Sequence, residues 1–547
     1  MKTSLRISLT LTFLACCFNT SFGQQLPSLP NVTGNFEINS QYYRKDAAIE
    51  APDVPEHFLS NGFMNLNYTN NNFSAGIRYE SYLNPLQGYD VRYKGSGIPY
   101  RFASFKMDHL KITVGSFYDQ FGNGLTFRSY EERALGVDNA MDGIHVAYEP
   151  IKGVILKGLV GEQRNYFSKG PGIVRGFDAD FQLNDMLTSM ANTKLRIGLG
   201  GSFVSKYQKD DSPSRILPEN VAAVAGRTNL NYGKFSLNAE YAYKYNDPSL
   251  VNGYIYKNGE ALYLNMGYVQ KGLGVKLTGK RIDNMSFRSD RGATGNSLSI
   301  NYLPAINKTL TYRLSTLYPY ATQPNGEMGI SGEVYFLVKA TDTKVSISGS
   351  AINDLKKTPA ANDTLGYTSD FLAVGENRYY QDFTTEITQK INKNNKIILT
   401  YIYQYYDKNT IEGEIGNRKV TAHIGVVDFT HKLSKTKSLR FEFQHLLTKK
   451  DPVAETFGSH ITGSWAMGLV EYSISPSWSF AIFDEYNYGN DKAYQFHYYN
   501  GSFAYTVGGT RISLGYARQH AGLLCVGGVC RYVPASNGAN ISITSRF

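Results

Sequence analysis

The chain has little cysteine, little tryptophan and little charge, and these shortages exclude several classes of protein. Four cysteines in 547 residues are too few for a disulfide-dense secreted scaffold. Disordered chains are poor in aromatic residues, whereas 14% of this chain is aromatic and only 19% is charged. No run of about 20 apolar residues occurs beyond the N-terminus, which excludes a helical membrane protein. The formal charge of +10 forms no basic block, which argues against nucleic-acid binding.

The N-terminus has the pattern of a cleaved signal peptide. A basic start leads into an apolar core, and Ser21-Phe22-Gly23 supplies the small residues of a cleavage site. Cys16 and Cys17 raise lipidation as an alternative, but the residues before them make a poor lipobox. We therefore expect residues 1–23 to be removed during export and residues 24–547 to form the mature protein.

The dominant pattern in the rest of the chain is alternation with a period of two residues. Ile77 and Tyr79, for example, alternate with Arg78 and Glu80, which is what a strand with one apolar and one polar face requires. The same alternation is found in Phe73–Leu83, Phe235–Lys244, Leu310–Tyr318, Val345–Ala351, Ile397–Tyr405 and Leu439–Leu447. Helical stripes longer than two turns are missing, so the sequence predicts an all-β fold.

The connections between the predicted strands alternate between short and long. The short turns are rich in Asn, Gly, Asp and Pro, which supply the backbone angles that tight hairpins need. The long polar connections are residues 44–57, 84–99, 119–141, 206–219, 247–258, 353–376, 407–418 and 521–536. Short turns at one end and long loops at the other are typical of an outer-membrane barrel. We predict a single transmembrane antiparallel β-barrel of about 26 strands (24–26), with short periplasmic turns and long extracellular loops.

The last predicted strand ends at Phe547, which shares a face with Ile541 and Ile543. An amphipathic final strand that ends in Phe resembles the C-terminal assembly signal of bacterial outer-membrane proteins. It predicts contact with outer-membrane lipid, and with the barrel-assembly machinery during insertion.

The most charged stretch of the chain begins in the loop of residues 119–141 and continues into the next strands. Its charged residues include Arg128, Glu131, Glu132, Arg133, Asp138, Asp142, Glu162 and Arg164. Charged rings set selectivity in pores, so we expect this loop to fold inward and these side chains to lie near a constriction of the lumen. A solvated external loop and salt bridges that fill a wide lumen are the alternatives. The carboxylates of Glu131, Glu132, Asp138 and Asp142 also suggest a calcium site, because Ca²⁺ binds carboxylate oxygens. The spacing of an EF-hand is missing, however, and we predict no bound metal.

Cys525 and Cys530 flank the sequence Val-Gly-Gly-Val. A two-residue Gly-Gly turn brings the flanking residues to a separation that a disulfide can bridge, and export provides an oxidising environment. We predict a structural disulfide that rigidifies the tip of the last external loop. A redox or metal role is the alternative, although the spacing is not that of a zinc site.

Motifs of known enzyme classes are missing from the sequence. It contains no G-x-S-x-G, no H-E-x-x-H and no phosphate-binding loop, and its nine histidines are scattered. We predict that the protein is not an enzyme and needs no cofactor.

Two stretches of the sequence resemble a known group of proteins. They are Asp119-Gln120-Phe121-Gly122-Asn123-Gly124-Leu125, followed by Arg128, and Gly527-Gly528-Val529-Cys530-Arg531-Tyr532-Val533-Pro534. With their flanking segments they are similar to outer-membrane β-barrel proteins of Bacteroidota that carry no assigned function. The resemblance implies the compartment and the architecture, and it implies no substrate.

The predicted barrel is wide enough for water, since large barrels leave a channel unless they are plugged. We therefore expect a porin-like conduit for a polar solute or polymer. The alternative is a structural or assembly subunit of an envelope secretion or barrel-insertion complex, with a lumen filled by its own loops and an outer face that meets partner proteins.

Overall fold

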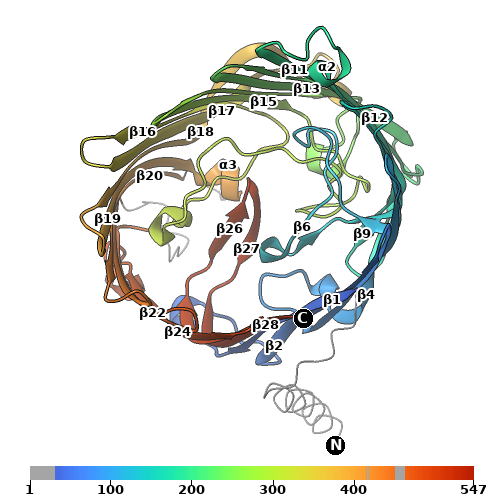
Figure 1. Cartoon of the computed structure of the whole chain (residues 1–547). Coiled ribbons are helices and arrows are strands. Elements are labelled where there is room, and N and C mark those ends of the chain that lie inside the picture. The colour runs from blue at the N-terminus through green and yellow to red at the C-terminus, as the bar shows by residue number, and fades with distance from the viewer. Residues whose placement is uncertain (1–30, 414–415, 417, 450–461) are drawn as a thin grey trace, which may run out of the picture.

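The computed structural model describes residues 31–413, 416, 418–449 and 462–547. Within these residues, 24 antiparallel strands form one closed barrel, seen along its axis in Figure 1. Each wall strand pairs with the next along the chain, and the last strand closes on the first through a ladder from Asn35↔Arg546 to Tyr43↔Gly538. The prediction of an all-β antiparallel barrel is confirmed, with the number of strands at the lower end of the predicted range.

The wall strands are β1 (Val32–Tyr43), β2 (Phe58–Asn70), β3 (Phe73–Asn84), β4 (Gly95–Lys106), β5 (Leu110–Phe117), β8 (Met141–Tyr148), β9 (Val154–Asn165), β10 (Ser168–Gln182), β11 (Leu195–Tyr207), β12 (Asn220–Tyr232), β13 (Phe235–Lys244), β14 (Gly259–Gln270), β15 (Leu273–Asp283), β16 (Glu327–Val338), β17 (Thr343–Pro359), β18 (Tyr367–Lys390), β19 (Asn395–Asp407), β20 (Lys419–Lys432), β21 (Lys437–Thr448), β22 (Trp465–Ile474), β23 (Trp478–Tyr486), β24 (His497–Val507), β25 (Thr510–Gln519) and β28 (Ser536–Arg546). Two short hairpins stand apart from the wall, β6 (Glu131–Glu132) with β7 (Val137–Asp138), and β26 (Gly522–Val526) with β27 (Val529–Val533). The helical turns are η1 (Ala47–Ile49), η2 (Val91–Tyr93), η3 (Arg133–Leu135), α2 (Leu183–Met186), η4 (Leu250–Asn252), η5 (Arg313–Leu317), η6 (Asp363–Leu365), α3 (Lys408–Glu412) and η7 (Lys492–Tyr494). In the described part of the chain, no helix is long and apolar enough to cross a membrane.

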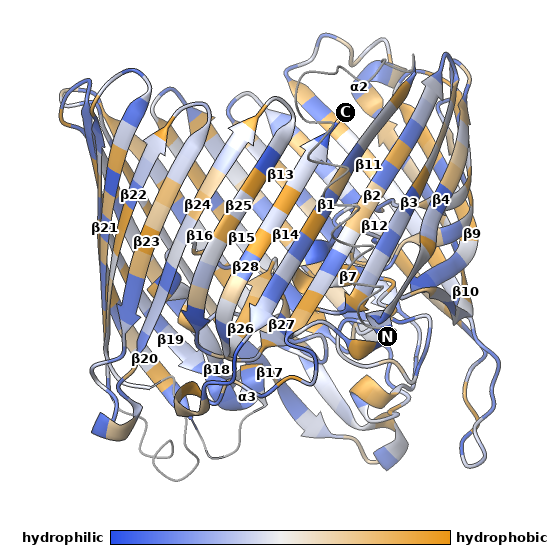
Figure 2. Ribbon diagram, turned by 90° about the horizontal axis from the view of Figure 1, so that it is seen from below, coloured by the Kyte–Doolittle hydropathy of each residue, from blue (hydrophilic) through white to orange (hydrophobic). Residues whose placement is uncertain are grey.

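The two faces of the wall reverse the usual arrangement of a water-soluble protein. On β3, the outward side chains of Ile77 and Tyr79 are 43% and 41% exposed, whereas the inward side chains of Arg78 and Glu80 are only 3% and 1% exposed. Figure 2 shows hydrophobic and hydrophilic residues alternating along the strands. Apolar residues outside and charged residues inside are what a barrel surrounded by lipid requires.

The two ends of the barrel differ in the length of their connections. At one end, tight turns such as Asn70–Phe73 and Tyr232–Phe235 join neighbouring strands. The C-terminus lies at this end in Figure 2, and most of the connections at the opposite end are long. The predicted asymmetry is confirmed, although residues 353–359 and 367–376, predicted as loop, extend β17 and β18.

Among the connections that turn back into the barrel, three are joined to one another by hydrogen bonds, and Figure 1 shows them in the lumen. They are the first inner segment (residues 118–140), the second inner segment (residues 284–326) and the hairpin segment (residues 520–535), and together we call them the lumen plug. Leu310–Tyr318, predicted as a wall strand, lies in the second inner segment and contains η5 instead. Its apolar side chains pack against the inner wall, so its alternation has a cause other than lipid contact.

Candidate functional site

The three parts of the lumen plug are hydrogen-bonded to one another. The first and second inner segments exchange backbone bonds, from Arg128 N to Ile300 O at 2.8 Å and from Tyr302 N to Gly124 O at 2.9 Å. The hairpin segment joins them through its tip, because the Tyr302 hydroxyl donates to the carbonyl of Gly527 at 2.7 Å. The plug is therefore one connected body, although its parts are far apart in the sequence.

A buried network of ion pairs attaches the first inner segment to the wall. Its members are Glu37, Arg78 and Glu80 on β1 and β3, Arg164 on β9, and Glu131, Arg133 and Asp138 on the segment. Arg78 is central, with Nε 2.7 Å from Glu80, Nη1 2.9 Å from Glu131, and Nη2 paired with Asp138. Because Arg78, Glu80 and Arg164 are almost fully buried, each needs these partners to offset its lost hydration.

Four of the eight predicted lumen residues belong to this network, namely Glu131, Arg133, Asp138 and Arg164. Asp138 and Arg164 lie close together, with Nη1 2.5 Å from Oδ2. Their wall partners Glu37, Arg78 and Glu80 were not predicted. The alternating pattern marks these three as inward-facing, but it carries no signal for which loop they meet.

Arg128 and Glu132 lie on the same inner segment but have other partners. The guanidinium of Arg128 stacks between two rings, 4.5 Å from the centre of Tyr130 and 4.0 Å from that of Tyr302. Such cation–π contacts hold a cation without a carboxylate. The side chain of Glu132 accepts a hydrogen bond from Ala134 N at 3.2 Å and caps η3.

Asp142 and Glu162 are cross-strand neighbours on β8 and β9, on the outward face of the barrel. Asp142 lies 3.4 Å from Arg101, and both carboxylates lie within 3.3 Å of Lys169. The structure thus separates these two residues from the other six. In the described residues, no group of three or more acidic, histidine or cysteine side chains is placed to hold a metal ion.

The stretch Asp119–Leu125 has a structural explanation in the plug. Asp119 accepts hydrogen bonds from His145 at 2.8 Å and Lys157 at 2.7 Å. Although burial raises the pKa of the Asp119 carboxyl, these hydrogen bonds outweigh burial, and the pKa lies below its usual range. At Asn123, the backbone and side-chain nitrogens both donate to Glu240 on β13, at 2.6 and 2.8 Å. The motif therefore bridges two nearby parts of the wall, β8 and β9 on one side and β13 on the other.

Gly122 allows this close approach to β13. Its φ is +52°, and a Cβ placed on it would overlap the Glu240 carboxylate. Only glycine fits both the left-handed backbone and the missing space.

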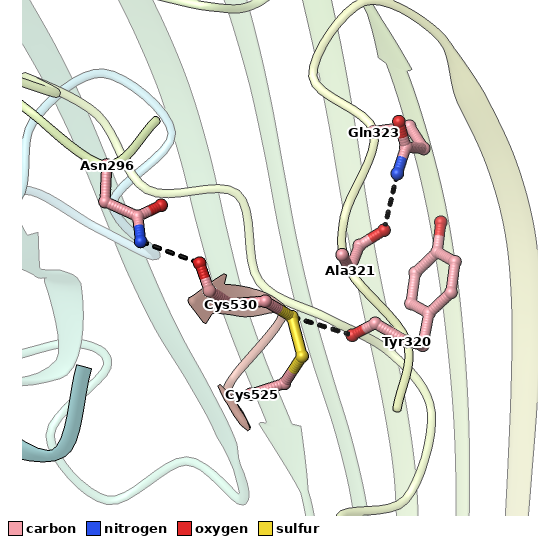
Figure 3. Close-up of a disulfide and its surroundings, with 6 residues drawn as sticks. All are labelled: Asn296, Tyr320, Ala321, Gln323, Cys525 and Cys530. Carbon is pink, nitrogen blue, oxygen red and sulfur yellow. Dashed lines mark hydrogen bonds between the residues drawn. A yellow bond between two sulfur atoms is a disulfide. The ribbon is translucent and has the colours of Figure 1, made fainter. Parts of the chain in front are cut away.

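The hairpin segment carries the predicted disulfide between Cys525 and Cys530, shown in Figure 3. The bond is confirmed, but its predicted place at the tip of an external loop is wrong, because the hairpin lies inside the lumen. Asn296 donates to the carbonyl of Cys530 at 2.8 Å, and Thr322 N donates to that of Gly528 at 3.0 Å. Burying the tip against the second inner segment satisfies backbone groups that water would otherwise have to solvate.

Three buried lysines of the wall hold the second inner segment in place, and sequence reasoning missed them. They are Lys206 on β11, Lys244 on β13 and Lys280 on β15. Each ammonium group donates to a backbone carbonyl of the segment, those of Arg288, Ser286 and Pro304, at 2.7–2.8 Å. Lys206 also pairs with Asp247, and Lys280 with Glu327.

The plug leaves the two sides of the lumen in different environments. Against the second inner segment, inward residues such as Ile402, Ile424 and Leu446 are fully buried in an apolar cluster. On the seam between β1 and β28, the inward positions are polar and partly exposed, as at Asn39 and Ser542. A cavity of about 470 Å³ lies at this polar seam, between the wall and the hairpin segment, and we call it the seam cavity.

A family model described as "Family of unknown function (DUF6029)" matches residues 4–547. No curated protein matches the sequence.

Solved structures similar to this chain include a siderophore receptor, an outer membrane transporter and OpdL. The siderophore receptor PirA from Pseudomonas aeruginosa is 9% identical, with a TM-score of 0.45, and the match covers 94% of this chain and 80% of that chain. The outer membrane transporter YddB from Escherichia coli is 9% identical, with a TM-score of 0.37 and coverage of 95% and 81%. OpdL from Pseudomonas aeruginosa is 10% identical, with a TM-score of 0.32 and coverage of 94% and 98%. At these identities no ligand or residue role passes to this chain.

Proposed function

The chain belongs to this family, DUF6029, whose function is unknown, and from its geometry we propose that it is an outer-membrane channel for a polar solute. The single observation that carries the proposal is the polar, partly exposed seam that the plug leaves along β28 and β1. Inward small and polar residues continue this surface onto β25, where Ser513 pairs with Ser542. A solute passing through the barrel would move along this seam.

The proposed membrane location rests on the outer face of the wall. Outward aromatic pairs lie near the tight-turn end, such as Phe235 with Tyr268, whose ring centres are 4.7 Å apart, and Trp478 with Tyr505 at 4.4 Å. Aromatic girdles of this kind mark the boundary between lipid and water. We infer export through the predicted signal peptide of residues 1–23, which lies outside the described residues.

The predicted assembly signal at Phe547 lies where the barrel closes. The backbones of Gly34 and Phe547 exchange hydrogen bonds of 2.8 and 3.0 Å beyond the last ladder pair. This placement supports a role for the final residue in sealing β28 against β1.

For the charged residues predicted at a constriction, we propose two roles. Those in the ion-pair network, together with the stacked Arg128, position the plug. Asp142 and Glu162 instead belong to a charged group at the long-loop end of the outer face, where the polar region of the bilayer begins.

Conductance tests the channel directly. The refolded chain of residues 24–547 would be inserted into a planar bilayer, and heat-dependent gel migration would first establish that the barrel is folded. We expect stable, discrete current steps, since polar side chains line the seam. A shortened variant that replaces residues 521–534 with a short Gly-Ser linker should give larger steps. Silence from both inserted proteins would contradict the proposal.

The extent of the plug favours a second candidate, a structural or assembly subunit of an envelope complex. Its lumen would need no through-path, and the three interlocked segments would serve to stiffen the barrel. This candidate predicts that the inserted protein is silent and that cross-linking in the cell envelope captures a defined protein partner.

A further inference from the structure

The seam cavity is lined mainly by polar residues. Its polar residues include five amides, Asn39, Gln41, Gln87, Gln519 and Asn540, and none of its lining residues in the described chain is acidic. Its volume of about 470 Å³ falls in the range of pockets that hold small molecules. Amide groups both donate and accept hydrogen bonds, which suits a ligand rich in hydroxyl groups.

Arg531, on β27, supplies an uncompensated positive charge at this cavity. Its Nε donates to the carbonyl of Ala134 at 2.7 Å, and its guanidinium lies 4.3 Å from the ring centre of Tyr89. Nη1 has no hydrogen-bond partner, and within the described residues no carboxylate lies within ion-pair distance. Burial therefore lowers the pKa of Arg531, with the neighbouring tyrosines only partly opposing it.

In contrast, the positive charge of Arg313, the other arginine that lines the seam cavity, is compensated by a carboxylate of the protein. Arg313 pairs with Glu485 and stacks over Phe483, with its guanidinium carbon 4.3 Å from the ring centre. Its charge is thus neutralised within the protein. A partly buried guanidinium without a carboxylate partner, such as that of Arg531, would gain from an anionic ligand.

Arg531 also borders a second cavity, of about 290 Å³, on the other side of the hairpin segment. Three tyrosines line this space, Tyr89, Tyr93 and Tyr166. Asp90 and Asp138 also line this second cavity, so an anion is favoured on the seam-cavity side of Arg531 rather than on this side. The charge therefore stands at the border of an amide-lined cavity and a tyrosine-lined cavity.

We propose that the seam cavity binds an acidic saccharide, a solute that carries a carboxylate among hydroxyl groups, and that Arg531 holds the carboxylate. The planar guanidinium matches a carboxylate with paired donors, while the amides take the hydroxyl groups. As an account of what the channel carries, this inference rests on the proposed function, but the binding site itself can be measured without any transport.

Equilibrium binding to the full barrel in detergent micelles tests the site. The probes are digalacturonate, an acidic disaccharide, and maltose, a neutral one, with heat released on titration as the readout. We expect digalacturonate to bind the wild type about tenfold to a hundredfold more tightly than maltose, the range for a charge-assisted hydrogen bond. Arg531→Gln should remove that preference, and Arg531→Lys should keep part of it. Lys152→Gln removes one charge from an exposed turn and should change nothing.

Asn540→Asp provides a second variant that leaves the hairpin contacts of Arg531 intact. It places a carboxylate in the cavity lining and should weaken digalacturonate binding while sparing maltose. Equal binding of the two sugars by the wild type, or an unchanged preference in folded Arg531→Gln and Asn540→Asp proteins, would overturn the proposal. Preferential binding of digalacturonate without current steps would support this binding site and contradict the channel. Current steps without preferential binding of digalacturonate would support the channel and contradict this binding site.

Discussion

At the scale of single residues, glycine determines how closely the plug approaches the wall. At Gly122 a left-handed backbone meets the Glu240 carboxylate, and at Gly527 the hairpin tip meets the Tyr302 hydroxyl, where a Cβ would overlap the hydroxyl oxygen. Neither position has room for a larger residue. Turn-forming glycines can be recognised in a sequence, but the group that each one approaches cannot, because it belongs to a distant segment.

Replacing Gly122 with Ala should therefore loosen the first inner segment. The new Cβ strains the left-handed backbone and displaces Glu240, so we expect a loss of about 1–3 kcal/mol in the free energy of unfolding. Urea unfolding in micelles measures this loss, and protease cleavage within residues 118–140 reports the loosening. Gly226→Ala is the matched control, because its Cβ meets nothing within 4 Å. Equal stability of the two variants would refute the role given to Gly122.

At the scale of elements, the wall strands were predictable and the inner segments were not. Alternation in Phe73–Leu83 and Phe235–Lys244 predicts β3 and β13 because one side of each strand faces apolar surroundings. Leu310–Tyr318 shows a similar pattern, yet Leu314 and Leu317 are buried against the lumen wall. An apolar periodicity reports burial in an apolar environment, and it does not distinguish lipid from a packed lumen.

The candidate site was predictable only in part, for the same reason. Charge density marked the first inner segment, and the Gly-Gly turn marked the disulfide. The central residue of the network, Arg78, lies 60 positions before its partner Asp138. A pairing over that distance depends on the fold of the intervening chain, which periodicity does not reveal.

The ion-pair network gives a test at this scale. Arg78→Leu removes the cation shared by the buried Glu80 and Asp138 and the partly exposed Glu131, so we expect a loss of about 3–5 kcal/mol in unfolding free energy. Arg92→Leu removes an exposed pair with Asp90 and should cost no more than about 1 kcal/mol. Urea unfolding of both variants, followed by tyrosine fluorescence, makes the comparison. Similar losses would mean that the network does not hold the plug.

At the scale of the whole molecule, the reversal of polarity across the wall predicts how the barrel responds to added charge. Ile77 lies on the outward face of β3, away from both ends of the strand. Ile77→Arg should cost about 2–4 kcal/mol in unfolding from lipid vesicles if this face meets hydrocarbon. Ile216→Arg, at an exposed apolar residue in a long connection, should cost almost nothing. Equal effects would contradict the membrane-spanning orientation.

The position of the hairpin segment along the chain has a consequence for the order of assembly. The hairpin leaves the wall after β25 and returns as β28, the strand that closes on β1. The strand that closes the ring is therefore directly continuous with the segment that completes the plug. A barrel in which β28 is not paired with β1 would also lack the anchor that holds the hairpin segment in the lumen.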